Sequence, residues 1–141
     1  WFDGTTLPSA WRTSTVTTSG VMSTTAPSYR YEVGFVGTPG WARAIAVSSE
    51  YAYVADDDAG VRVIDVSTPT APVEVGFVDT PGRAYGVAVS RGHAYVADFN
   101  QGLRVVDISA PSAPVEVASL DTAGAAVGVA VSGRYAYVAD S

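Results

Sequence analysis

The sequence of 141 residues lacks cysteine and lysine entirely. Without cysteine there are no thiol nucleophiles, disulfide bonds or thiolate metal ligands to consider. All eight basic residues are arginines, spread along a chain of net charge −6. Because phosphate backbones are bound by clustered positive charge, we expect no nucleic-acid partner. No apolar run approaches the roughly 18 to 20 residues that a membrane-spanning helix needs, so we expect no membrane insertion.

Charged residues are also few, at 16%, whereas 48% of the residues are apolar, which is typical of a folded domain and not of a disordered tail. His93 is the single histidine, and no serine or carboxylate accompanies it at a recognisable catalytic spacing. We therefore expect no enzyme activity. The chain starts at Trp1 and not at a methionine, which favours a processed protein or a piece of a longer one.

A repeat of 42 residues organises most of the chain. The pentapeptide Ala-Tyr-Val-Ala-Asp occurs at residues 52–56, 94–98 and 136–140. Residues 29–70 and 71–112 are identical at 23 of 42 positions, and residues 71–99 and 113–141 at 19 of 29, which excludes coincidence. The sequence thus reuses one structural unit.

Each unit contains four short runs rich in Val, Ile and Tyr, separated by turns that contain Gly, Pro, Asp and Ser. In the middle unit these runs are residues 72–78, 83–90, 93–98 and 103–108. No apolar pattern of helical period exceeds a turn. Four strands in a unit of about 40 to 45 residues are typical of a β-propeller blade, so the sequence predicts an all-β fold of four-stranded antiparallel blades.

The motifs inside the repeat also resemble a known family. Gly-Val-Arg-Val-Ile-Asp-Val-Ser at residues 60–67 and Gly-Leu-Arg-Val-Val-Asp-Ile-Ser at residues 102–109, each after Ala-Tyr-Val-Ala-Asp, resemble the LVIVD repeat. The resemblance covers residues 29–141. It implies a β-propeller, commonly in exported or cell-surface proteins of bacteria and archaea, and it implies no single activity.

The number of repeats is small for a propeller. Residues 29–70, 71–112 and 113–141 amount to about 2.7 blades, whereas closed propellers have roughly four to eight. We therefore expect an incomplete ring whose last blade has two strands. An open strand edge exposes unpaired N–H and C=O groups, so we expect self-association or binding to other surface proteins.

Residues 1–28 stand outside this repeat. Their start, residues 1–11, resembles the opening of secreted jelly-roll lectin-like domains, where a Phe-Asp-Gly turn precedes Pro-x-x-Trp. The remainder is rich in Thr and Ser. We expect its alternating segment 12–18 to form a strand, either docked on a blade edge or ending a preceding domain.

Acidic residues gather in turns that should share one face of the propeller. They are Asp56, Asp57, Asp58 and Asp98 in one set of turns, and Asp79 and Asp121 in the other. Because Ca²⁺ takes about six to eight oxygen ligands, Asp56, Asp57 and Asp58 are candidate calcium ligands. Turn formation explains the same residues more simply, and no other cofactor is expected.

Five side chains near the same face differ between units and are candidates for a binding surface: Trp41, Arg43, Arg83, Tyr85 and Phe99. A repeating frame fixes the loops and leaves their tips free to vary. Asp65 and Asp107 instead recur in each unit two residues before a serine, which indicates a turn-capping role.

These observations favour a non-enzymatic, extracellular or cell-surface propeller module that serves protein interaction or structural self-assembly. Two alternatives stay open. The acidic face with its aromatic side chains fits a carbohydrate- or cation-binding domain, and the chain also fits a fragment of a larger propeller enzyme whose catalytic residues lie outside it.

Overall fold

The computed structural model of the protein describes residues 18–22 and 32–141. These residues form twelve strands and no helix. Consequently, the described ranges contain no helix of the length and apolar character needed to cross a membrane. The segments 1–11 and 12–18, for which we expected a lectin-like start and a strand, lie outside the described residues apart from Thr18.

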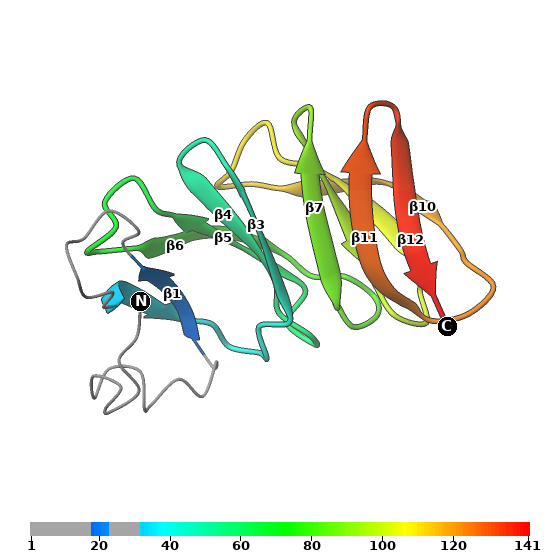
Figure 1. Ribbon diagram of the computed structural model, residues 1–141, viewed down its shortest axis with the longest axis horizontal. Coiled ribbons are helices and arrows are strands. Elements are labelled where there is room, and N and C mark those ends of the chain that lie inside the picture. Colours follow the sequence, from blue (N-terminus) through cyan, green and yellow to red (C-terminus); the bar gives the residue numbers. More distant parts are fainter. Residues whose placement is uncertain (1–17, 23–31) are drawn as a thin grey trace, which may run out of the picture.

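The strands form four sheets (Figure 1). One four-stranded sheet consists of β3 (Ala44–Ser48), β4 (Tyr51–Ala55), β5 (Val61–Asp65) and β6 (Val73–Val78) in that order. The next consists of β7 (Gly86–Ser90), β8 (His93–Ala97), β9 (Leu103–Asp107) and β10 (Val115–Leu120). The two-stranded sheets pair β1 (Thr18–Met22) with β2 (Glu32–Gly37), and β11 (Ala126–Ser132) with β12 (Tyr135–Asp140).

Every pair of neighbouring strands is antiparallel. The prediction of an all-β fold built from four-stranded antiparallel blades is therefore confirmed, and the described residues form a partial propeller. In each complete blade the first strand is the innermost and the fourth the outermost. The last sheet, β11 with β12, has the two strands expected of it.

The blade boundaries differ from the sequence units 29–70 and 71–112. We grouped strand 72–78 with the strands that follow it, but β6 pairs with β5, which precedes it, and β10 pairs with β9 in the same way. A hydrogen-bonded turn, in which Ala71 N–H donates to the Thr68 carbonyl at 2.9 Å, reverses the chain between β5 and β6. The two complete blades therefore span residues 44–78 and 86–120.

The main core lies between these two blades. The inner strands β3, β7 and β11 lie side by side (Figure 1), and each sheet packs face to face on the next. Small side chains of β3, Ala44 and Ala46, pack into the same cluster as Val87 and Val89 of β7. The buried members of the core are Tyr53, Ala55, Val61, Val63, Ala84, Val87, Ala94, Val96, Val106 and Ile108.

Strand β1 follows the repeat although residues 1–28 looked separate from it. Its register with β2 includes a bulge after Val21, and the register of β5 with β6 includes a bulge after Val63, which lies 42 residues later. The residues that flank the two bulges also have equivalent partners: Val21 with Gly34 and Met22 with Glu32, and Val63 with Gly76 and Ile64 with Glu74. β1 and β2 are therefore the third and outer strands of a further blade.

Candidate functional site

Each blade fixes the turn that leads to its inner strand with the aspartate of Ala-Tyr-Val-Ala-Asp. Asp56 accepts hydrogen bonds from the Thr38 hydroxyl at 2.7 Å and from the Gly40 N–H at 2.8 Å. The same two bonds recur in the following sheets, from Thr80 and Gly82 to Asp98 and from Thr122 and Gly124 to Asp140. Burial raises the pKa of Asp98, and its hydrogen bonds and the nearby Arg104 act against that rise. A contact that repeats in every blade is structural.

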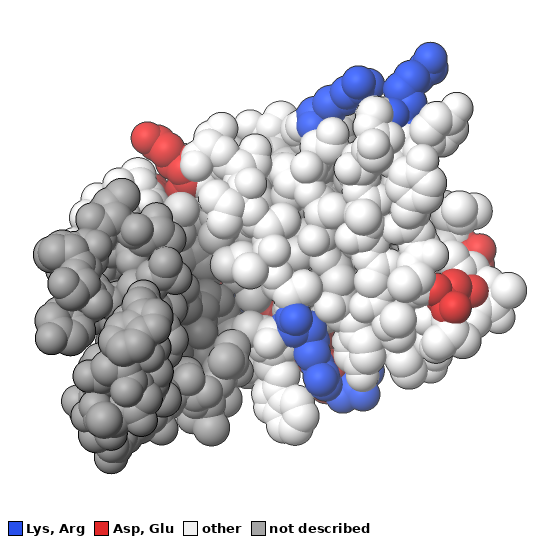
Figure 2. Space-filling view, in the orientation of Figure 1, with Lys and Arg blue, Asp and Glu red and all other residues white. Residues whose placement is uncertain are grey.

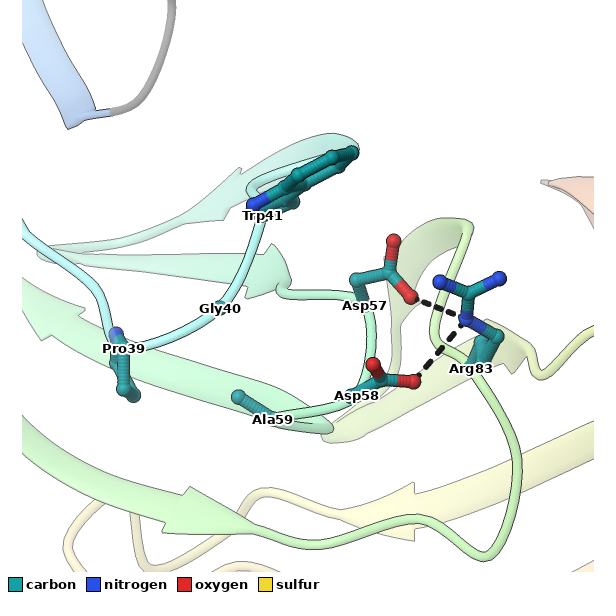
Figure 3. A pocket seen from close by; sticks show the side chains of 7 residues that line it. All are labelled: Pro39, Gly40, Trp41, Asp57, Asp58, Ala59 and Arg83. Atoms are coloured by element: carbon teal, nitrogen blue, oxygen red, sulfur yellow. Dashed lines mark hydrogen bonds and ion pairs between the residues drawn. The ribbon is translucent and has the colours of Figure 1, made fainter.

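Asp57, the next residue, lies between two guanidinium groups. Arg43 Nε donates to Asp57 Oδ2 at 2.7 Å. Arg83 Nε lies 2.7 Å from Asp57 Oδ1 and 3.0 Å from Asp58 Oδ1 (Figure 3). The two carboxylates raise the pKa of Arg83, so its charge is secure. Two arginines and two aspartates leave this part of the surface close to electrically neutral.

This geometry does not support the predicted calcium site at Asp56, Asp57 and Asp58. Both oxygens of Asp56 accept bonds from the preceding turn, and a cation beside Asp57 would meet two arginines. Within residues 18–22 and 32–141, no three His, Cys, Asp or Glu side chains are arranged to hold a metal ion. The calcium site was predicted because the three aspartates are adjacent in the sequence, but consecutive side chains of a turn face different neighbours.

The five candidate binding residues do come together. The guanidinium carbon of Arg43 lies 5.4 Å from the Trp41 ring centroid and 4.8 Å from that of Tyr85, so the cation is stacked between two aromatic rings. Tyr85 packs on Phe99 with ring centroids 4.9 Å apart, and Arg83 lies 5.9 Å from the Tyr85 ring. The set connects the first complete blade to the second.

The backbone explains why Asp57 is placed at this junction. Its φ of 52° is in the left-handed region, which is uncommon for a residue other than glycine. In this conformation it exchanges two backbone hydrogen bonds with Ala84 of the next blade, at 3.2 and 3.0 Å. Phe99, one repeat later, has a φ of 47° and bonds in the same way to Ala126. Asp57 and Phe99 thus share one backbone conformation because they occupy the same repeat position, although their side chains differ.

A cavity of about 480 Å³ lies beside this network. Trp41 forms one side, and its residue is 69% exposed, so the ring presents a flat apolar surface. In Figure 3 the dashed lines run from the Asp57 and Asp58 carboxylates to Nε of Arg83. The complete lining is Pro39, Gly40, Trp41, Asp57, Asp58, Ala59 and Arg83. Sequence reasoning missed Pro39, Gly40 and Ala59, although the recurrent Thr-Pro-Gly turn was a usable signal for the first two.

The cavity occurs at one blade junction and is not a feature of every repeat unit. At the repeat positions of Trp41, Arg43 and Asp57 the third unit has alanine, valine and serine, namely Ala125, Val127 and Ser141. These residues offer no ring stack or ion pairs of this kind. The first junction therefore has a surface that the repeat itself does not require.

Other residues singled out from the sequence have structural roles. Ser67 N–H donates to Asp65 Oδ1 at 2.8 Å, and Ser109 N–H donates to Asp107 Oδ1 at 2.8 Å, so both aspartates cap turns as expected. These serines lower the pKa of Asp65 and of Asp107. His93 Nδ1 lies 3.1 Å from the Arg91 carbonyl oxygen in the β7–β8 turn.

Charged side chains are sparse on the side of the molecule where the inner strands lie. Figure 2 shows this surface mostly white, with basic side chains in two separate groups at its upper and lower edges. The sequences of β3, β7 and β11 contain no charged residue. The inner strands thus present an uncharged surface, bounded by charged turns.

A family model described as LVIVD repeat matches residues 39–80, 81–122 and 123–141. The first two matches contain the two complete blades, and the third contains β11 and β12. No curated protein matches the chain significantly. The match to the repeat family agrees with the blade boundaries that the strand pairing defines.

Proposed function

The chain belongs to the LVIVD-repeat family, and on that premise we propose that it is a non-enzymatic propeller module that binds further copies of itself or other surface proteins through its incomplete blades. We place it outside the cell or at the cell surface, because the family resemblance implies exported proteins. The role is structural association and not chemistry, since the buried carboxylate of its best-formed site, Asp57, is held by ion pairs with two arginines.

One comparison carries this proposal. Tyr53 and Tyr137 occupy the same repeat position, but Tyr53 is 3% exposed in the core between two blades and Tyr137 is 59% exposed on the last sheet. A large aromatic side chain whose counterpart is buried indicates a surface built to be covered. Contact with another protein would bury it as the next blade buries Tyr53.

Light scattering after gel filtration tests the association. We expect the 141-residue chain to elute with a mass above 14.5 kDa, and Tyr137→Ser to shift it toward the monomer. Arg134→Ser, an exposed change in the neighbouring β11–β12 turn, is the matched control and should behave as the unmodified chain. A monomer at every concentration of the unmodified chain would contradict the proposal.

A second candidate function rests on the cavity at Trp41. An exposed indole ring beside guanidinium N–H donors and carboxylate acceptors suits a neutral polyhydroxylated ligand, which stacks on the ring and exchanges hydrogen bonds with Arg83 and Asp58. The balanced charge disfavours a free cation or anion. A carbohydrate is therefore the ligand class that this cavity fits.

Glycan-array binding tests this second candidate. Trp41→Ala should abolish binding to any glycan that the unmodified chain retains, because the stacking surface is lost. Leu120→Ala, another exposed apolar residue remote from the cavity lining, controls for general stickiness. Binding that survives Trp41→Ala would exclude this cavity as the site.

A further inference from the structure

The two-stranded sheets at the ends of the described chain are complementary halves of one blade. A complete blade has an inner strand, a second, a third and an outer strand, as in β3-β4-β5-β6. The last sheet supplies the inner and second strands, β11 and β12. The first sheet supplies the third and outer strands, because β1 and β2 keep the register and the bulge of β5 and β6.

The two halves lie at opposite ends of the row of sheets. In Figure 1, β1 and β2 lie beside the first complete blade, whereas β11 and β12 lie beyond the second. Within the described residues, the second strand of each complete blade pairs on both sides, and β12 pairs on one side. β12 is the repeat equivalent of β4 and β8, which pair along the corresponding edge with β5 and β9.

We infer that two copies of this chain close a six-bladed ring, in which β12 of one copy pairs with β1 of the other at two equivalent seams. This inference rests on the proposed self-association and specifies its partner and its geometry. The described residues of each copy, 18–22 and 32–141, contribute twelve strands, so those of two copies contain six sets of four. Six lies within the roughly four to eight blades of closed propellers, whereas the described strands of one copy make three sets and those of three copies make nine.

The repeat fixes the register of this seam. In the first blade Tyr53 lies opposite Val63, and in the second Tyr95 lies opposite Val105. The equivalent residues at the seam are Tyr137 of one copy and Val21 of the other, each displaced by whole repeats of 42 residues. Tyr137 should therefore oppose Val21, and Ala139 should oppose Ser19.

The faces that would meet across the seam are also complementary. Ile45 of β3 is 53% exposed, whereas Val87 at the same position of β7 is 7% exposed, because β3 of the preceding blade covers it. In that covered junction the contact is made by Ala44 and Ala46. Their equivalents on β11 are Gly128 and Ala130, equally small. The small-residue face of β11 from one copy thus fits the exposed face of β3 from the other.

Disulfide trapping tests the register directly, because the chain has no cysteine of its own. Val21→Cys and Tyr137→Cys are prepared as separate proteins, mixed in equal amounts and oxidised. Directly opposed residues of an antiparallel pair have Cα atoms about 4.5 to 5.5 Å apart, within disulfide range. We expect cross-linked dimers from the mixture and little from either variant alone, since each seam then has one thiol. Ser19→Cys mixed with Tyr137→Cys is the register control and should cross-link less.

The outcomes separate this inference from the proposed function. A mass of twice 14.5 kDa together with the Val21–Tyr137 cross-link supports the ring. An oligomer that grows beyond the dimer, or that cross-links no better through Val21 than through Ser19, overturns the ring while the proposed association stands. A monomer overturns both.

Discussion

At the scale of single residues, the aspartate of each Ala-Tyr-Val-Ala-Asp motif connects a strand end to the turn that enters the inner strand. Asp98 is fully buried and accepts from the Thr80 hydroxyl at 2.6 Å and the Gly82 N–H at 2.9 Å. A partly buried donor that loses its acceptor carries a desolvation penalty, which makes this aspartate a sensitive position.

Two substitutions of Asp98 should therefore have very different effects. Asp98→Ala leaves both donors without an acceptor and should lower the free energy of unfolding by about 2 to 4 kcal/mol. Asp98→Asn keeps one oxygen for Gly82 and places an amide N–H near the Thr80 hydroxyl oxygen, so its loss should be much smaller. Urea denaturation followed by tryptophan fluorescence measures both, and equal losses would contradict this account.

Asp107 should make the stability of the folded chain depend on pH in the acidic range. Hydrogen bonds from Ser109 lower the pKa of Asp107 below 3.8, so this carboxylate binds protons more weakly in the folded chain than in the unfolded chain. Its contribution is present above pH 3.8 and disappears as the pH falls through the lowered pKa.

Asp107→Ala should accordingly be less stable than the unmodified chain at neutral pH, with a difference that shrinks in acid. Asp107→Asn keeps an acceptor for the Ser109 N–H but does not ionise. Its stability should therefore not show the additional loss that the unmodified chain shows as Asp107 is protonated in acid. Urea midpoints on both sides of pH 3.8 provide the measurement, and a difference independent of pH would refute the assignment.

At the scale of elements, the turn between the second and third strands depends on a glycine. Gly60 has a φ of +70°, and a Cβ on it would lie 2.3 Å from the Val78 carbonyl oxygen of the outer strand. The glycine of the β7–β8 turn, Gly92, has a φ of +76° with nothing within 4 Å. A side chain at position 60 would thus introduce both backbone strain and a steric clash, whereas a side chain at position 92 would introduce backbone strain alone.

Gly60→Ala should therefore destabilise the chain more than Gly92→Ala. For Gly92→Ala we expect about 1 to 2 kcal/mol, the usual penalty of a left-handed alanine. For Gly60→Ala we expect more than that, because β6 must also move. Thermal unfolding of the two variants compares them, and equal shifts of the Tm would show that the clash relaxes freely.

The elements were largely predictable from sequence, while their grouping was not. Strands alternate with turn residues in a pattern that local chemistry determines, so the 42-residue blade unit was recognised. The pairing of β6 with β5 depends on which of two loops reverses the chain, residues 67–72 before β6 or residues 79–82 after it. Both loops contain proline, so the sequence does not distinguish them. β1 escaped notice because it has Gly20 where the frame has Arg62, so its place is visible only in its register.

The site was half predictable for a related reason. The five variable residues were recognised because a repeat shows which positions differ. The convergence of Arg43 and Arg83 on Asp57 could not be recognised in the sequence. It requires two blades to pack together and a left-handed backbone at Asp57. The three adjacent aspartates suggested a calcium site that the pairing with arginine removes.

At the scale of the whole molecule, each sheet is stabilised by the sheet that covers it. Residues of the first blade that face the second are buried, whereas Val47 and Ile45 on its opposite side are 63% and 53% exposed. Covering such residues releases apolar surface from water, which favours association. The stability of the chain should then depend on its concentration.

Any partner that binds the folded chain and not the unfolded one raises its apparent stability by mass action. We therefore expect the Tm of the unmodified chain to rise with chain concentration. Val47→Asp introduces a charge on the exposed face of β3, where an isolated chain tolerates it and an apolar interface does not. This variant should unfold at one temperature regardless of concentration, with the low-concentration Tm of the unmodified chain. Calorimetry across a concentration series measures this, and a Tm of the unmodified chain that stays constant would mean that the exposed faces are stable in water alone.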